Sequence, residues 1–175
     1  QKVGYGENDE YLGGSFIQDE TVVFHANVES PQYWRIETKD VYTGKGWVRS
    51  DQEEPFIVTE DGDVHLPFIS DLVETETKEG SITFNEQELI PKLVYPYGVS
   101  AVQALDETSY LLSYHQETGE IYPMINGEET YLADYELTYE EPTFSLQVLR
   151  ENTTEDPVSI KERYTQLPDS VPDRV

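Results

Sequence analysis

Residues 33–47 read YWRIETKDVYTGKGW, and we expect the rest of the chain to be organised around them. Apolar or uncharged residues alternate with charged ones from Trp34 onward, and a period of two predicts a strand with one buried and one solvated face. Asp40 interrupts this alternation, and the two glycines in residues 43–46 permit the positive φ angles of a tight turn. The return strand begins at Trp47. Both tryptophans of the chain lie in this stretch, so it predicts a hairpin that anchors a hydrophobic core through both indole rings.

The composition agrees with a sheet protein. The chain has 175 residues, of which 37% are hydrophobic and 12% aromatic, with 13 tyrosines and a single methionine. That content is enough to bury a core, and it excludes global disorder. Aromatic enrichment favours strands over helices. We therefore expect a mainly β fold, an antiparallel β-sandwich or open barrel of about eight to ten strands, with short helices at the C-terminus.

The net charge is the most extreme global property of the sequence. It is −25, with an isoelectric point near 4.1, and no Lys or Arg occurs between Lys92 and Arg150. Such a field repels phosphate backbones and anionic lipid, which argues against nucleic-acid binding and against membrane binding through a basic patch. A solvated, self-repelling surface explains the charge more simply than a dedicated cationic partner does.

Three segments differ in composition and predict the domain organisation. Residues 1–20 place four glycines among acidic residues and predict a flexible lead-in from a membrane segment. Residues 21–150 carry the strand patterns and predict the β domain. Residues 151–175 predict a helical linker, because Asp156 followed by Pro157 is a typical helix start. No apolar run approaches the roughly 18–20 residues that span a bilayer, and the chain starts without Met, so we expect an excised piece of a longer protein.

Within the β domain, residues 21–29 alternate cleanly and predict a strand. Residues 110–114, 120–124 and 130–139 predict three strands of a meander. The Asn-Gly pair at 126–127, flanked by apolar segments, is the strongest hairpin signal in the chain.

The sequence offers little recognisable catalytic chemistry. It has no phosphate-binding loop, no dinucleotide glycine motif, no nucleophile elbow and no His-Glu-x-x-His pair. His25, His65 and His115 are far apart and lack metal-ligand spacing, so each is most simply a surface or hydrogen-bonded histidine. Asp61-Gly62-Asp63 has part of the character of a calcium loop but lacks its other ligands. We expect neither a metal nor a cofactor.

Several blocks of the sequence resemble one known family. The chain is similar to the extracytoplasmic domain that lies between the N-terminal membrane helices and the catalytic core of bacterial membrane-anchored transglutaminase-like proteins. The block from 33 to 47 is the most specific part of this resemblance, whereas residues 48–92 match only in general character. The matching blocks are LGGSF (12–16), TVVF (21–24), YWR (33–35), DVYTGKGW (40–47), LVYPYG (93–98) and YTQLPDSVPDRV (164–175).

The resemblance implies a non-catalytic accessory or spacer module at the extracytoplasmic face of the bacterial cell membrane. Its partners would be the downstream transglutaminase-like core of the same chain and the membrane helices of the parent protein. The module would position the Cys-His-Asp core, and presentation of a protein or peptide substrate is a further role that it suggests. No catalytic residue carries over, because the chain contains no cysteine and the family's chemistry requires a Cys thiolate.

Two other classes of function stay open at this point. One is a stand-alone ligand-binding β domain that uses exposed aromatic residues near Trp34 and Trp47, and the other is a hydrolase with scattered carboxylates. An exposed aromatic groove would favour the former, and carboxylates clustered inside a cleft would favour the latter. The candidate binding residues are Trp34, Arg35, Asp40, Tyr42, Gly44, Gly46 and Trp47.

Overall fold

The structure is a computed structural model, and the chain in it forms two compact units. The larger unit contains residues 22–38 and 54–152, and the smaller unit contains residues 1–21, 39–53 and 153–175. The residues that the structure describes are 20–49, 56–67, 73–105, 109–143, 158, 161–162 and 165–166. They contain twelve strands, and every strand pairing is antiparallel. The predicted mainly β, sandwich-like fold is confirmed, and no sheet closes into a barrel within these residues.

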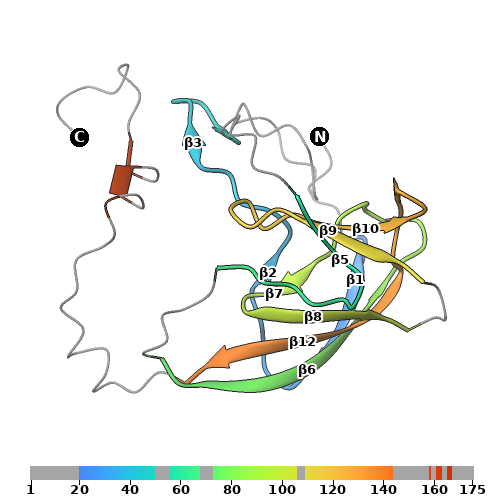
Figure 1. The fold of residues 1–175 in the computed structure, drawn as a ribbon. Coiled ribbons are helices and arrows are strands. Elements are labelled where there is room, and N and C mark those ends of the chain that lie inside the picture. The colour runs from blue at the N-terminus through green and yellow to red at the C-terminus, as the bar shows by residue number, and fades with distance from the viewer. Residues whose placement is uncertain are drawn as a thin grey trace. The chain divides into compact units, whose positions relative to one another are not determined.

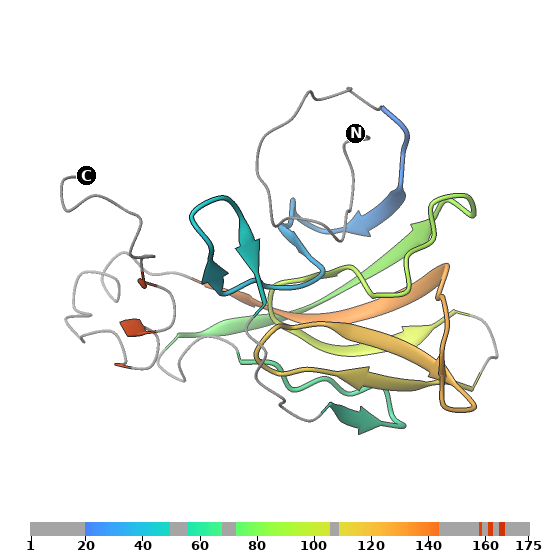
Figure 2. The same ribbon diagram turned by 90° about the horizontal axis from the view of Figure 1, so that it is seen from above.

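The first sheet of the larger unit has the strand order β1-β6-β12-β8. Its strands are β1 (Phe24–Val28), β6 (Thr75–Phe84), β12 (Asp134–Pro142) and β8 (Val99–Ala104). Figures 1 and 2 show β6, β12 and β8 side by side as long, curved strands. A bridge between Asp63 and Ala101 extends the β8 edge by one more segment.

The second sheet has the order β11-β10-β9-β5. Its strands are β5 (Ile57–Thr59), β9 (Leu111–Tyr114), β10 (Ile121–Ile125) and β11 (Glu128–Glu129). Asn126 and Gly127 both have positive φ, 55° and 83°, and join β10 to β11. These angles are those of a type I′ turn, so the hairpin predicted at 126–127 is confirmed.

The last strand of the predicted meander does not follow β11. Instead, β12 enters the first sheet and pairs with β6 along its whole length and with β8 on its other side. The alternating residues Tyr135, Leu137 and Tyr139 are all buried there, each at most 2% exposed. A strand with three large buried side chains requires a position inside a sheet, and the two-residue β11 offers no such position. The meander prediction is therefore wrong for this strand.

The core lies between the two sheets. Ile82, Tyr135 and Leu137 contribute from the first sheet, and Leu112 and Ile121 contribute from the second. All five are at most 2% exposed. Two sheets that bury their inner faces against one another form the sandwich-like arrangement.

A connecting segment, residues 93–96, is also buried in this core. The Tyr135 hydroxyl donates to the carbonyl of Val94 at 2.8 Å and accepts the Val94 N–H at 3.0 Å. These two bonds satisfy both backbone groups of a buried residue outside the sandwich strands. They therefore fix the strand β7 (Tyr95–Pro96) that follows.

The predicted hairpin of residues 33–47 is only half correct. β2 (Trp34–Arg35) pairs with β7, which lies about sixty residues further along the chain, and not with the strand that starts at Trp47. The observed hairpin is shorter and joins β3 (Val41–Tyr42) to β4 (Trp47–Val48). The break at Asp40 separates the two strand segments, and residues after it belong to the other compact unit.

The two tryptophans have different environments. Trp34 packs against the core cluster, and its ring meets that of Phe24 edge-on at 5.6 Å. Trp47 is 39% exposed and lies in the short hairpin of the smaller unit. The prediction that both indole rings anchor the core is therefore wrong for Trp47, whose strand pairs with β3 and with no other strand of the part of the chain that the structure describes.

The C-terminal segment is described at five positions. Val158, Lys161 and Glu162 are helical, and the Thr165 N–H donates to the Lys161 carbonyl at 3.1 Å. This agrees with a short helix in the predicted linker. In the described part of the chain, no helix is long and apolar enough to cross a membrane. The predicted lead-in, except for Glu20, and the remainder of residues 151–175 lie outside the described residues.

Candidate functional site

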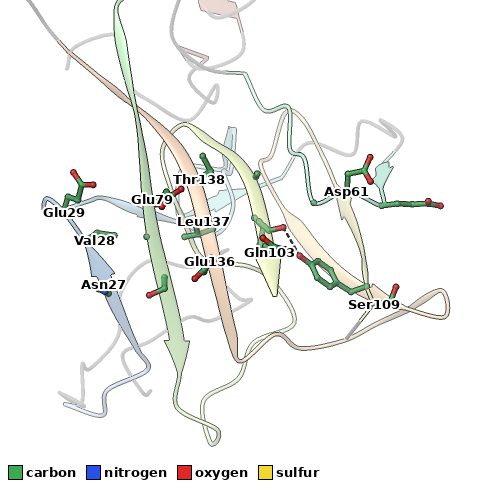
Figure 3. A pocket seen from close by; sticks show the side chains of 17 residues that line it. Asn27, Val28, Glu29, Asp61, Glu79, Gln103, Ser109, Glu136, Leu137 and Thr138 are labelled. Carbon is green, nitrogen blue, oxygen red and sulfur yellow. Dashed lines mark hydrogen bonds between the residues drawn. The ribbon is translucent and has the colours of Figure 1, made fainter. Parts of the chain in front are cut away.

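A trough of about 690 Å³ lies over the first sheet of the larger unit. All four strands of that sheet contribute to it, as Figure 3 shows. We call it the acidic trough, and its lining consists of residues 27–29, 60–62, 79–81, 101–103, 109–110 and 136–138.

Strand register places one row of polar side chains across the sheet. Asn27 pairs with Ser81, Ser81 with Glu136, and Glu136 with Gln103. Directly paired residues of neighbouring strands point to the same face, about 5 Å apart. The row therefore forms the floor of the acidic trough, and the core residues between these positions point to the other face.

One glycine sets how closely the trough's edge approaches the sheet. Gly62 has a φ of 76°, and its carbonyl accepts the Val102 N–H at 2.9 Å. A Cβ at position 62 would overlap the Val102 carbonyl, so a larger residue would push the segment away. The close approach holds the neighbouring Asp61 at the β8 side of the trough, opposite Glu29 on the β1 side (Figure 3).

Five carboxylate side chains line the acidic trough, and no Lys or Arg is among its described lining residues: they belong to Glu29, Glu60, Asp61, Glu79 and Glu136. Glu29 forms an ion pair with Lys78, in which Oε2 and Nζ are 2.8 Å apart. Glu79 pairs with Thr138, and Glu136 pairs with Ser81, so the two glutamates sit diagonally on adjacent strands. Like charges at such positions repel one another. No group of three or more His, Asp or Glu residues suited to a metal ion occurs in the described part of the chain.

The seven candidate binding residues predicted from the sequence do not form one continuous strand pair. Trp34 and Arg35 belong to the larger unit, and the other five, from Asp40 to Trp47, belong to the smaller one. Arg35 donates to the Thr38 hydroxyl at 2.7 Å and lies 5.5 Å from the ring centre of Tyr97. Ligand binding by these seven residues stays a prediction.

The residues of the smaller unit form the β3–β4 hairpin. Tyr42 and Trp47 pair across the strands, with ring centres 5.1 Å apart. Gly44 has a φ of 84°, and the Gly46 carbonyl accepts the Thr43 N–H at 2.9 Å. Asp40 is 3% exposed, and its N–H donates to the Val48 carbonyl at 3.3 Å. The hairpin therefore presents an aromatic pair in which Trp47 is exposed and Tyr42 is half-buried.

A buried ion network in the larger unit was not predicted. The Lys92 ammonium lies 2.5 Å from Glu37 Oε2 and 2.8 Å from Glu120 Oε1. The three side chains are 11%, 17% and 1% exposed. The hydroxyls of Thr118 and Tyr122 donate to the Glu120 carboxylate, each at 3.0 Å. Glu120 thus has a cation and two hydroxyl donors around a fully buried carboxylate, as burial of a charge requires.

The network shifts the acidities of its members. Burial by itself would raise the pKa of Glu120, but the hydrogen bond and charge of Lys92, with the two hydroxyl donors, lower it to about 2. Burial, reinforced by the Glu120 charge, raises the pKa of Tyr122 to about 12. The carboxylate therefore stays ionised and the phenol stays neutral over the physiological range.

The turn that carries Glu120 is held by further bonds. The Thr118 N–H donates to His115 Nδ1 at 3.2 Å, and the Gly119 carbonyl accepts a hydrogen bond from the Tyr95 hydroxyl. The Thr38 N–H donates to the Thr118 carbonyl at 2.7 Å. Because its polar groups are turned toward one another and away from solvent, we interpret the network as a structural joint between the β2, β7 and β9–β10 segments.

The sequence contained weak signals for both features. In β6 and β12 the polar trough residues alternate with buried ones, so the strand period marks them as one face. The strand order that brings four such faces together is not encoded in any local pattern. For the ion network, the position of Lys92 next to an apolar run was the only signal in the sequence. The chain has 36 acidic residues, so the sequence did not indicate which of them would pair with this lysine.

Comparisons with known proteins place the chain beside a longer one. It is 35% identical over 179 aligned residues to the uncharacterized protein YebA of Bacillus subtilis (strain 168). The alignment covers 99% of this chain and 24% of YebA, so the chain spans about a quarter of that relative's length. No protein-family model matches the chain, and no solved structure matches it.

Proposed function

We propose that the chain is a non-catalytic accessory module of a longer, membrane-anchored transglutaminase-like protein, and that it lies at the extracytoplasmic face of the bacterial membrane. Its role is to hold the catalytic core of that protein in place. The observation that carries the proposal is the alignment of nearly the whole chain with about a quarter of YebA. The sequence blocks at 33–47 and 164–175 support it through their resemblance to transglutaminase-like proteins.

The chemistry of this chain is compatible with an accessory role. A transglutaminase-like core needs a Cys thiolate that a His activates, and this chain contains no cysteine. The nucleophile would come from another part of the longer protein. A rigid module suits the role, and the joint around Lys92 and Glu120 ties separate segments of the larger unit together.

An amine-incorporation assay tests this proposal. The purified chain should not attach a fluorescent primary amine to a glutamine-bearing protein such as casein, whereas full-length YebA should. Activity of the isolated chain would contradict the accessory role. Inactivity of full-length YebA, folded and in detergent, would contradict the transglutaminase-like part.

Location is tested separately. A protease site placed in the segment of YebA that matches this chain should be cut when protease is added to intact protoplasts. A control site in a cytoplasmic protein of the same cells should stay uncut. Protection of the YebA site until the protoplasts are lysed would place the segment on the cytoplasmic side and contradict the proposal.

A second candidate function is ligand binding by the β3–β4 hairpin. It is favoured by the 39% exposure of Trp47 and by the 5.1 Å contact of its ring with Tyr42. Aromatic side chains with one exposed face are typical of binding surfaces. A ligand that quenches tryptophan fluorescence of the chain but not of Trp47→Phe would support it.

A further inference from the structure

One face of the small sheet formed by β2 and β7 carries an arginine among tyrosines. Arg35 pairs with Tyr95 across the two strands, which lie side by side in Figure 1. The ring centre of Tyr97 lies 5.5 Å from the Arg35 guanidinium. Tyr33 stands two residues before Arg35, a spacing that places two side chains on the same face of a strand. Tyr95 is 1% exposed, Tyr97 is 38% exposed and Tyr33 is 93% exposed, so this face runs from the core out into solvent.

The Arg35 guanidinium contacts no carboxylate of the described residues. It donates a hydrogen bond to the Thr38 hydroxyl at 2.7 Å, and its other contact is the ring of Tyr97. Lys78 and Lys92, by contrast, each contact two or more carboxylates. The chain has 36 acidic residues and 11 basic ones. A half-buried cation without a carboxylate is therefore an exception in this part of the chain.

The free donors of Arg35 indicate what kind of group fits. A guanidinium has five N–H donors in a planar fork, which matches the two oxygens of a carboxylate or a phosphate. A phosphate would bring about two negative charges into the field of a chain whose net charge is −25, whereas a carboxylate brings one. The charge of the chain therefore favours a carboxylate.

The exposure of Tyr33 indicates that the occupant is a protein surface. At 93% exposure this ring packs against almost nothing in the described structure. Small-molecule sites enclose most of their ligand, and a protruding side chain does not. Tyrosine and arginine are the side chains that contribute most to protein–protein interfaces, where a charged pair is surrounded by aromatic contacts. The matching partner presents an acidic side chain with apolar surroundings.

The net charge also favours a partner that is covalently joined to this chain. An independent acidic protein, or a second copy of this chain, would approach against the field of 25 negative charges. A segment of the same polypeptide is held nearby at an effective concentration on the order of millimolar, which offsets the repulsion. The chain aligns with 24% of YebA, so most of that relative lies outside the matched part.

We propose that the face formed by Tyr33, Arg35 and Tyr97 docks an acidic side chain from a part of the longer protein outside this chain. The carboxylate accepts hydrogen bonds from Arg35, and the two tyrosine rings cover its apolar surroundings. The inference rests on the proposed function only in that the chain belongs to a longer protein, and it does not depend on the chemistry of that protein.

Photo-crosslinking in the longer protein that contains this chain tests the inference. Tyr33 is replaced by the photoreactive p-benzoylphenylalanine, which the fold tolerates because the side chain is 93% exposed. After irradiation of the folded protein in detergent, mass spectrometry should find position 33 joined to an acidic segment outside residues 1–175. The same replacement at Tyr131, which is 53% exposed in the same unit, should not reach that segment.

Substitution of Arg35 tests the role of the charge. R35Q should lower the yield of the crosslink from position 33 about threefold, because a central arginine contributes strongly to docking. The matched control K78Q removes the same charge from a lysine that already contacts carboxylates, and it should leave the yield unchanged. If R35Q fails to fold, as circular dichroism would show, Y97L removes the ring beside the guanidinium and should also lower the yield about threefold.

The remaining outcomes separate this inference from the proposed function. Crosslinks from position 33 that stay within residues 1–175, or that join two copies of the protein, would overturn the inference because the face would have another occupant. An unchanged yield in folded R35Q, or equal losses in R35Q and K78Q, would also overturn it. A longer protein that forms the crosslink but fails in the amine-incorporation assay would support the inference and contradict only the transglutaminase-like part of the proposed function.

Discussion

Replacing Lys92 with methionine tests the claim that the buried ion network joins separate segments of the larger unit. The substitution keeps most of the side chain's volume and removes the ammonium, which lies 2.5 Å from Glu37 and 2.8 Å from Glu120. Removal of one partner from a buried pair costs about 3–5 kcal/mol. We expect about 3 kcal/mol, because the hydroxyls of Thr118 and Tyr122 still donate to Glu120.

A matched control is available on the surface. Lys78 also contacts several carboxylates, with Glu29 at 2.8 Å and Glu76 at 3.6 Å, but those two side chains are 62% and 65% exposed. Solvated ion pairs contribute about 0–1 kcal/mol. Lys78→Met should therefore destabilise the protein clearly less than Lys92→Met does in urea unfolding followed by tryptophan fluorescence at pH 7.

The pH dependence separates lost charge pairing from lost packing. The pKa of Glu120 in the folded protein, about 2, lies below the ordinary value of 4.5. A carboxyl group with a lowered pKa in the folded protein stabilises the folded state at pH values above its ordinary pKa. This stabilisation disappears as the pH falls toward 2. In Lys92→Met, burial dominates and Glu120 takes up its proton at a higher pH, so the variant's deficit should shrink between pH 5 and pH 3. A deficit below about 1 kcal/mol at pH 7, or one that is the same at pH 3, would refute the role of the network.

Two further predictions concern single positions. Gly119→Ala should lower the free energy of unfolding by about 2–3 kcal/mol, because φ is 73° and the new Cβ would lie 2.5 Å from the Tyr95 hydroxyl. Gly127→Ala, with a φ of 83° and open space around it, should cost about 1 kcal/mol, and equal losses in urea titrations would contradict the close approach. Trp34→Ala should cost about 3 kcal/mol, because its ring packs on the core cluster. Trp47→Ala, at a ring that is 39% exposed, should cost about 1 kcal/mol, and the reverse order of thermal stabilities would show that the hairpin carries the larger contribution.

In the candidate site, the local sequence pattern predicted which residues share a face of a strand but not which strands are neighbours. The alternation in residues 130–139 puts Tyr131, Ala133, Tyr135, Leu137 and Tyr139 on one face of a strand. The last three are buried, whereas Tyr131, which precedes β12, is 53% exposed. The same alternation placed Glu136 and Thr138 on the opposite, polar face. It did not indicate that β6 and β8 would flank this strand. Glu136 and Thr138 become part of a trough only because those two strands lie on either side of β12.

The sequence alone determined the features that depend on neighbours along the chain. The period of two marked the strands within residues 21–29 and 130–139, and the Asn-Gly pair at 126–127 set a hairpin through its positive φ angles. The missing cysteines excluded a thiolate nucleophile in this chain. Those properties follow from backbone sterics and residue chemistry, which are local.

Features that depend on pairing between distant segments could be seen only in the folded structure. The partner of Trp34 is β7 and not the strand at Trp47, and Lys92 meets carboxylates 55 and 28 residues away. A strand exposes the same backbone donors and acceptors to any partner, so its neighbour is selected by how well whole buried faces fit together. With 36 acidic residues in the chain, the two that share Lys92 are selected by burial and geometry, which no local pattern contains.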